Sequence, residues 1–139
     1  MKKNDPITNI MTKEPLSVHT GQKMSEVRGL LAENPLHHLP VVSGKTLIGL
    51  ISTSDMLKLG VVVDGQDSRS WDAILDHQFE IENVMSKELT TLTEEDNVRK
   101  AAEMLSEGTF HSLPVVGNDN ELIGIVTSTD LIRYLVEQY

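Results

Sequence analysis

Two four-residue stretches of the chain combine hydroxyl side chains with a carboxylate. They are residues 52–55, with the sequence STSD, and residues 127–130, with the sequence TSTD. A carboxylate can accept both hydroxyl protons of a cis-diol, which is how dinucleotide-binding folds hold a ribose. Hydroxyl groups beside it can donate to phosphate or ribose oxygens. The pattern therefore predicts ribose contacts from Asp55 and Asp130, supported by Ser52, Ser54, Thr127 and Thr129.

The same residue types also have a purely structural use at the start of a helix. Ser, Thr and Asp side chains accept hydrogen bonds from the free amides of a first helical turn, and a carboxylate there interacts favourably with the helix dipole. Both stretches follow an apolar run and precede another, which is where a strand passes into a helix. The sequence leaves both uses open for each of these side chains.

A second duplicated feature is a histidine two residues before the tetrapeptide LPVV. His37 and His111 hold this position, and His38 and Ser112 stand between each histidine and the leucine. Neighbouring side chains of a strand point to opposite faces, so His37 and His38 cannot both face one ligand. At pH 7 a histidine supplies a hydrogen bond more readily than a full positive charge. The alternative for each of these histidines is a solvated surface position.

Both features recur because the chain contains an internal repeat. The stretch ITNIMTKEPLSV, which begins at Ile7, matches IENVMSKELTTL, which begins at Ile81. The match continues through HHLPVV and HSLPVV, and then through LIGLISTSDML and LIGIVTSTDLI. Repeats indicate supersecondary units that bury a core together. We therefore expect a first unit at residues 1–59, a linker at 60–80 and a second unit at 81–139.

Each repeat predicts the same order of elements. In the first repeat, a short strand at 16–18 precedes an amphipathic helix at 24–31. Two apolar strands at 39–42 and 47–51 then form a hairpin, and a second helix begins at the STSD stretch. The second repeat follows the same pattern. The predicted fold class is therefore mixed α/β (α+β), with two strand-helix-strand-strand-helix units.

The linker contains a short helical segment around Trp71, Ile74 and Leu75. Three potential metal ligands fall close together on this segment, but a solvated helix face is the favoured explanation for them. We therefore expect no metal site at Asp72, Asp76 and His77.

Composition excludes several classes of protein. The 139 residues carry a net charge of -9, which repels the phosphate backbone of nucleic acids. The absence of cysteine excludes disulfides and thiolate nucleophiles. No apolar run approaches the roughly 20 residues that span a bilayer, so we expect a cytoplasmic protein without membrane contact. We find no nucleophile with a positioned base and expect no enzymatic activity.

Taken together, the doubled MT/MS, LPVV and LIG…S/T-x-S/T-D motifs resemble tandem cystathionine-β-synthase (CBS) domains, the pair called a Bateman module. The resemblance covers Ile7 to about Leu135. It implies two units packed through their small sheets about a pseudo-twofold axis, with clefts that bind AMP, ADP, ATP or S-adenosylmethionine. It also implies a regulatory sensor that forms homodimers or acts on a partner protein, and that requires no cofactor.

The resemblance assigns roles to residues of this chain. It places the ribose-binding carboxylates at Asp55 and Asp130, and a phosphate-contacting side chain at the first histidine position. Relatives that bind triphosphates tend to carry Arg or Lys there, so we expect ligands with one phosphate, or none, to be preferred over ATP. Lys13 and Lys87 either reach a phosphate or are solvated. Apolar lining of an adenine slot is expected from Leu16, Val18, Ile51 and Val126.

Two other functions are weighed against this one. A protein-protein interaction module of the same fold could have lost its ligand, but it would not need hydroxyls and a carboxylate in both copies for packing alone. An enzyme that uses Asp55 and Asp130 as an acid-base pair is excluded by the implied symmetry, because each carboxylate would belong to its own cleft.

Overall fold

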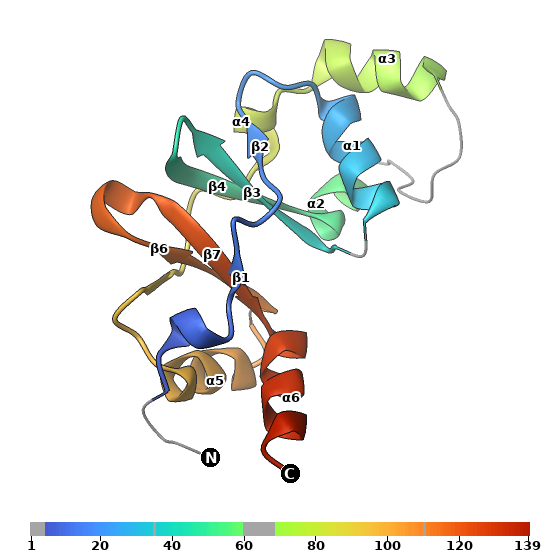
Figure 1. Cartoon of the computed structure of the whole chain (residues 1–139). Coiled ribbons are helices and arrows are strands. Elements are labelled where there is room, and N and C mark those ends of the chain that lie inside the picture. The colour runs from blue at the N-terminus through green and yellow to red at the C-terminus, as the bar shows by residue number, and fades with distance from the viewer. Residues whose placement is uncertain (1–4, 35, 60–68, 110) are drawn as a thin grey trace. The chain divides into compact units, whose positions relative to one another are not determined.

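The computed structural model describes residues 5–34, 36–59, 69–109 and 111–139, and these form two compact units (Figure 1). Unit 1 combines the described part of Met1–Pro15 with Thr90–Tyr139, whereas unit 2 is Leu16–Leu89. Each unit therefore contains the body of one repeat together with the segment that opens the other repeat. The predicted division at residues 1–59, 60–80 and 81–139 follows the repeats of the sequence, whereas the two compact units divide the chain near residues 15 and 89. Residues 60–68 of the predicted linker lie outside the described residues.

Unit 2 has a three-stranded sheet with its helices packed against it. The strand order is β2-β3-β4, in which β2 runs parallel to β3, and β3 runs antiparallel to β4. Its elements are β2 (Val18–His19), α1 (Met24–Glu33), β3 (His38–Ser43), β4 (Thr46–Ser52), α2 (Thr53–Lys58), α3 (Arg69–Gln78) and α4 (Ile81–Val84).

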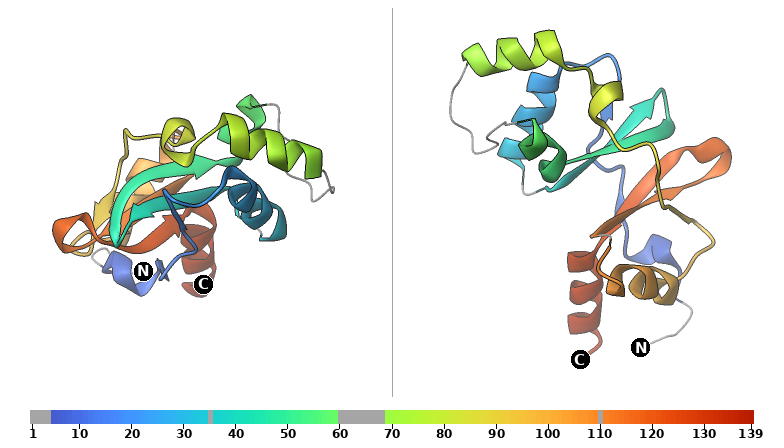
Figure 2. Two further views of the ribbon diagram at one scale, coloured as in Figure 1. Left: turned by 90° about the horizontal axis from the view of Figure 1, so that it is seen from above. Right: turned by 180° about the vertical axis from the view of Figure 1, so that it is seen from behind.

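Unit 1 repeats this design with one more strand. Its sheet has the order β1-β7-β6-β5, with β5 parallel to β6, and β7 antiparallel to both of its neighbours. Helices α5 and α6 lie on the same side of the β6-β7 hairpin (Figure 2). Its elements are η1 (Ile7–Asn9), β1 (Thr12–Lys13), β5 (Leu92–Thr93), α5 (Val98–Ser106), β6 (Ser112–Val116), η2 (Asn118–Asn120), β7 (Leu122–Thr127) and α6 (Ser128–Glu137).

The predicted order of strand, helix, strand, strand and helix is confirmed in both repeats. The first strand is shorter and begins later than expected, because only Val18–His19 and Leu92–Thr93 pair with a neighbour. The hairpin turn of unit 2 uses Gly44 at φ 64°, a left-handed conformation that glycine adopts without strain. In unit 1 the longer turn places Asp119 and Asn120 in that region instead.

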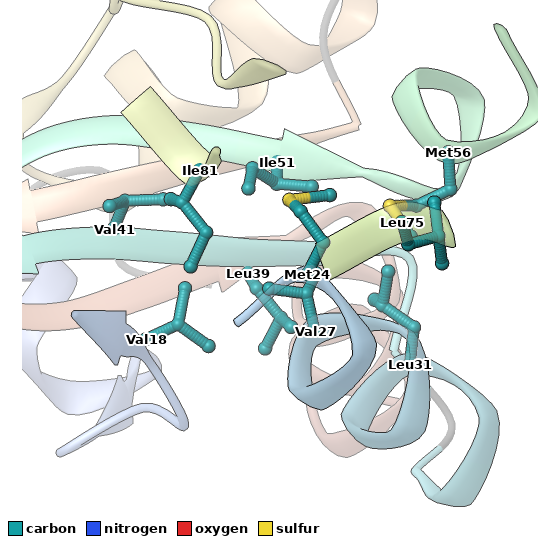
Figure 3. Close-up of a cluster of buried hydrophobic side chains, with 10 residues drawn as sticks. All are labelled: Val18, Met24, Val27, Leu31, Leu39, Val41, Ile51, Met56, Leu75 and Ile81. Carbon is teal, nitrogen blue, oxygen red and sulfur yellow. The ribbon is translucent and has the colours of Figure 1, made fainter. Parts of the chain in front are cut away.

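Each unit has its own aliphatic core. In unit 2 the apolar face of α1 meets the inward side chains of β3 and β4, and α3 contributes Leu75 (Figure 3). Burial of such side chains is the main favourable term in folding, at roughly 25 cal/mol per Å² of apolar surface. The unit 1 core consists of Ile7, Leu92, Ala101, Leu105, Leu113, Val115 and Val126.

A methionine-glycine contact joins each repeat body to the borrowed segment. A Cβ added to Gly49 would lie 2.8 Å from Met85 Cγ and still closer to its sulfur. A Cβ on Gly124 would lie 2.5 Å from Met11 Sδ. The glycine of each LIG motif therefore leaves room for the methionine that opens the other repeat. Backbone pairing fixes the same contact, since Ser86 and Leu50 exchange hydrogen bonds of 2.9 and 3.1 Å.

The predicted helical segment of the linker is α3, and its carboxylates are not simply solvated. Asp76 accepts hydrogen bonds from the Ser25 amide (2.9 Å) and the Ser25 hydroxyl (2.8 Å), at the start of α1. Asp72 lies 3.1 Å from Arg28, whose side chain is buried. These contacts give both carboxylates a structural role. Among the described residues, no group of His, Asp or Glu is arranged to hold a metal ion.

Candidate functional site at two strand-to-helix junctions

The first candidate site is the junction of β4 and α2. Ser52 is the N-cap of α2, and its hydroxyl accepts a hydrogen bond from the Asp55 amide at 3.1 Å. In return, Asp55 Oδ2 accepts from the Ser52 amide at 2.8 Å. This reciprocal arrangement is a capping box, which satisfies two amides that the helix itself leaves free.

The second candidate site, at the junction of β7 and α6, repeats the first closely. Thr127 is the N-cap, and its hydroxyl accepts from the Asp130 amide at 3.1 Å. Asp130 Oδ2 accepts from the Thr127 amide at 2.9 Å. Capping by these residues is therefore present in both repeats. In each repeat, the carboxylate that takes part in the cap belongs to the third residue of the helix.

Capping does not use the whole carboxylate. Within the described part of the chain, the hydrogen bonds that the Asp55 and Asp130 carboxylates accept all go to Oδ2, and Oδ1 has no protein donor. Both residues are partly exposed. A carboxylate has about four lone-pair positions, so a cap and a diol can be served together. The structural and the ligand-binding uses are thus compatible at these two residues.

The amide of the first helical residue is already occupied in both junctions. The Thr53 amide donates to the His37 carbonyl at 2.9 Å, and the Ser128 amide donates to the His111 carbonyl at 3.1 Å. The sequence did not predict this role for His37 and His111, because it depends on their backbone carbonyls rather than on their imidazole rings. The hydroxyls of Ser54 and Thr129, in the second helical position, are on exposed residues.

The residue after each histidine is the one that stands opposite the cap. In the antiparallel ladders His38 pairs with Ser52, and Ser112 pairs with Thr127. Directly opposite residues place their side chains on the same face of a sheet. His37 and His111 are exposed, His38 is partly buried and Ser112 is buried. The structure thus brings His38 and Ser112, rather than the two first histidines, beside the caps within the sheets.

The remaining predicted contacts fall into two groups. Val18, Ile51 and Val126 are completely buried in the cores of their own units, which accounts for their apolar character. Lys13 and Lys87 are exposed, as is Leu16. Lys13 lies on β1, which pairs with β7, the strand that leads to Thr127. No described helix is both long and apolar enough to cross a membrane.

Comparison with known families decides the classification. Residues 7–62 and 81–137 each match the CBS domain. The chain belongs to the CBS domain family. The two matches coincide with the two repeats, so the expected tandem CBS pair is confirmed. The mixed α/β fold class is confirmed as well, because solved CBS pairs superpose on nearly the whole chain.

Solved structures similar to this CBS pair include proteins with bound adenosyl compounds. The CBS domain pair of protein MJ0100, solved with 5′-methylthioadenosine and S-adenosyl-L-methionine, is 25% identical, covers 98% of this chain and 99% of its own, and has a TM-score of 0.76. Protein MJ1225 from Methanocaldococcus jannaschii is 26% identical, with a TM-score of 0.81 over 97% of this chain and 49% of its own. CBSX2 in complex with AMP, at 24% identity and TM-score 0.80, covers 96% of this chain and 98% of its own and supports the fold.

Curated relatives are longer proteins that contain a matching segment. A homoserine O-acetyltransferase from Methanocorpusculum labreanum is 30% identical over 90% of this chain, but the match covers 23% of that enzyme. An L-aspartate semialdehyde sulfurtransferase from Methanocaldococcus jannaschii is 29% identical over 92% of this chain and 23% of its own length. The match to this CBS pair thus covers about a quarter to a half of the length of these curated relatives.

Proposed function

We propose that this CBS pair is a regulatory module that binds an adenosyl ligand at its strand-to-helix junctions. The observation that carries the proposal is the duplicated capping box in which Asp55 and Asp130 each keep Oδ1 available. Membership in the CBS family and similarity to MJ0100, solved with two adenosyl compounds, support the choice of ligand class. The module itself is proposed to have no catalytic role.

In the proposed complex each carboxylate holds a ribose diol. Asp130 Oδ1 accepts the two hydroxyl protons while Oδ2 continues to cap α6. Thr127 and its counterpart Ser52 already accept from the Asp amides, but their hydroxyl protons remain able to donate to a ligand oxygen. Ser54 and Thr129 are exposed at the same helix starts and can contact a phosphate.

The junctions offer limited affinity for anions, and this favours a small charge on the ligand. Of the first three helical amides at α6, those of Ser128 and Asp130 are committed to protein acceptors, which leaves that of Thr129. His37 and His111 are exposed and supply hydrogen bonds rather than a permanent charge. We therefore propose that AMP, or an adenosyl compound without phosphate, binds better than ATP. Calorimetry in which ATP binds tenfold more tightly than AMP would contradict this order.

The experiment that tests the site separates capping from ligand binding. In Asp130→Asn the amide oxygen can still accept from the Thr127 backbone, so the cap survives, but the side chain can no longer accept both protons of a diol. In Asp130→Ala the hydrogen bond to the Thr127 amide is lost as well, although the Thr127 hydroxyl still caps α6, and the loss of such a hydrogen bond costs about 1 kcal/mol. The proposal predicts that AMP affinity at this junction falls in both variants, whereas stability falls mainly in Asp130→Ala.

A second function is favoured by one specific observation. Both carboxylates act as caps without a ligand, so the structure is compatible with an interaction module of CBS fold that binds no small molecule. A calorimetric screen with adenosine, AMP, ATP and S-adenosylmethionine separates the two functions. Absence of binding by all four compounds would favour the interaction module.

Signalling requires that the ligand prefers one conformation of the module over another. Differential affinity for two states is sufficient to shift their populations. We propose a homodimer or a regulated partner protein in the cytoplasm as the receiver of this shift. Exposed apolar side chains on α6, namely Ile132, Leu135 and Val136, support an interface on this helix. Sedimentation of the purified chain with and without AMP measures whether assembly responds to the ligand.

A further inference from the structure

Ser112 carries a polar atom that the protein leaves without a partner. The residue is 5% exposed, and among the described residues its Oγ is the one buried side-chain nitrogen or oxygen that has no hydrogen-bond partner. A buried hydroxyl without a partner costs about 1–3 kcal/mol. Such groups are rare in native structures and call for an explanation, such as a functional role or an ordered water or ion.

The position of Ser112 places this hydroxyl beside the helix start of unit 1. Ser112 pairs with Thr127, the N-cap of α6, so both side chains lie on the same face of the sheet. The Ser128 amide donates to the His111 carbonyl, so the neighbouring Ser112-Thr127 pair is of the non-hydrogen-bonded type. Side chains approach most closely in pairs of that type. The unpartnered hydroxyl therefore adjoins the residues proposed to hold the ligand.

Unit 2 does not repeat this feature. The residue opposite its N-cap is His38, which is partly buried and already has an interaction within the protein. The helix that follows is also shorter, since α2 has 6 residues and α6 has 10. The two junctions therefore share the cap and the carboxylate, but they differ in the group that stands across the sheet.

We propose that the junction in unit 1 is the tighter of the two adenosyl sites, and that the Ser112 hydroxyl binds an uncharged polar atom of the nucleoside. This inference rests on the proposed function and adds which site dominates and which part of the ligand it reads. An adenine ring nitrogen, the amino group or a ribose hydroxyl matches a neutral hydroxyl that both donates and accepts. A phosphate is a poor partner at a position this buried, because it would lose its hydration there.

The test uses Ser112→Ala in the full chain, with adenosine and AMP as probes in calorimetry. Removing the hydroxyl should lower the affinity of the tighter site for both compounds by the same factor, about 5- to 30-fold. The stability of the ligand-free protein should stay the same or rise, because an unsatisfied buried polar group has been replaced by an apolar one. Ser106→Ala, on α5 of the same unit, is the matched control, since its hydroxyl only donates to the Glu103 carbonyl.

Two further variants assign the tighter site to a unit. Asp130→Asn should remove the tighter binding event, and Asp55→Asn should remove the weaker one. The reverse assignment, two sites of equal affinity, or an unchanged affinity in Ser112→Ala would overturn the inference while leaving the proposed function intact. A loss confined to AMP would overturn the assignment to the nucleoside. Failure of adenosine and AMP to bind the unmodified chain would instead overturn the proposed function itself.

Discussion

At the scale of single residues, the same side chains serve as caps and as candidate ligand contacts. Asp55 and Asp130 each commit Oδ2 to the fold and keep Oδ1 available. The sequence could predict the residues and the helix starts, because hydroxyl and acid at this spacing form a capping box. It could not choose between cap and ligand contact, because both uses require the same chemical groups. The atomic positions show that the cap uses Oδ2 and that, among the described residues, Oδ1 has no donor.

Asp96 in unit 1 makes the stability of the turn that precedes α5 depend on pH. Burial raises the pKa of this carboxyl, but hydrogen bonds from the Thr93 amide (2.7 Å) and from Lys100 (3.0 Å) outweigh it, so that the pKa lies below its ordinary value. A group whose pKa is lower in the folded state stabilises the fold above its unfolded pKa of about 3.9. This contribution is lost as the pH falls through the lower, folded pKa.

We expect Asp96→Asn to destabilise the protein by about 1 kcal/mol at neutral pH, and we expect the difference to disappear in acid below the folded pKa. Chemical denaturation between pH 2 and 7 measures this. The corresponding residue of the first repeat, Gln22, accepts from the His19 amide at 2.7 Å but cannot ionise. Gln22→Ala is therefore the control at neutral pH for loss of the turn hydrogen bond, and it is compared only there because Gln22 also donates to the Glu26 carboxylate at 2.7 Å. A pH-independent difference for Asp96→Asn would contradict the assignment.

At the scale of elements, local patterns in the sequence were sufficient for most of the fold. The period of α1, the hairpin of β3 and β4 and the STSD helix start each depend on neighbouring residues, and all three were predicted. The exchange of opening segments between repeats was not, because β1 pairs with β7 across more than a hundred residues. The contacts of Asp72 and Asp76 with α1 were missed for the same reason.

The exchange gives the glycines of the two LIG motifs different tolerances. In Gly49→Ala the three atoms nearest the new methyl group all belong to the Met85 side chain, whereas in Gly124→Ala one of the three nearest atoms is the Thr12 carbonyl oxygen, at 3.0 Å. Overpacking of this kind typically costs 1–3 kcal/mol. We expect both substitutions to destabilise the protein, with Gly124→Ala costing more because a backbone atom moves less readily than a side chain.

Double variants distinguish the two contacts. Adding Met85→Ala to Gly49→Ala should remove most of the steric conflict, so the two losses should be clearly less than additive in thermal denaturation. Adding Met11→Ala to Gly124→Ala should give less relief, since the contact with the Thr12 carbonyl persists. Equal relief in the two pairs would show that the backbone contact has no energetic importance.

At the scale of the whole molecule, duplication supplies two similar junctions that are free to diverge. Each repeat keeps a capping box, yet Ser112 and His38 differ in burial and in partners. The sequence shows directly that Ser112 stands where the first repeat has His38, but it does not show that Ser112 is buried. Burial depends on what the folded chain places over that face of the sheet. Divergence between duplicated sites is therefore visible in the sequence, whereas its energetic meaning is not.

Ligand binding should appear in the stability of the intact chain. A ligand that binds only the folded state stabilises it by about 2.7 kcal/mol at a concentration of 100 times Kd, which corresponds to a rise of roughly 8 °C in Tm for a protein of this size. We expect AMP to raise Tm progressively as first one junction and then the other fills. ATP at equal concentration should raise it less, because the helix starts have few free amides.

The same measurement on variants identifies the groups responsible. Asp130→Asn should move the onset of the AMP-dependent rise to higher concentration, and the double variant with Asp55→Asn should abolish the rise. Ribose 5-phosphate is the control ligand, since it carries the sugar and one phosphate without the base. A rise in Tm that persists in the double variant would show that AMP stabilises the chain at a site other than the two carboxylates, and the sensing role assigned to the duplicated junctions would then be wrong.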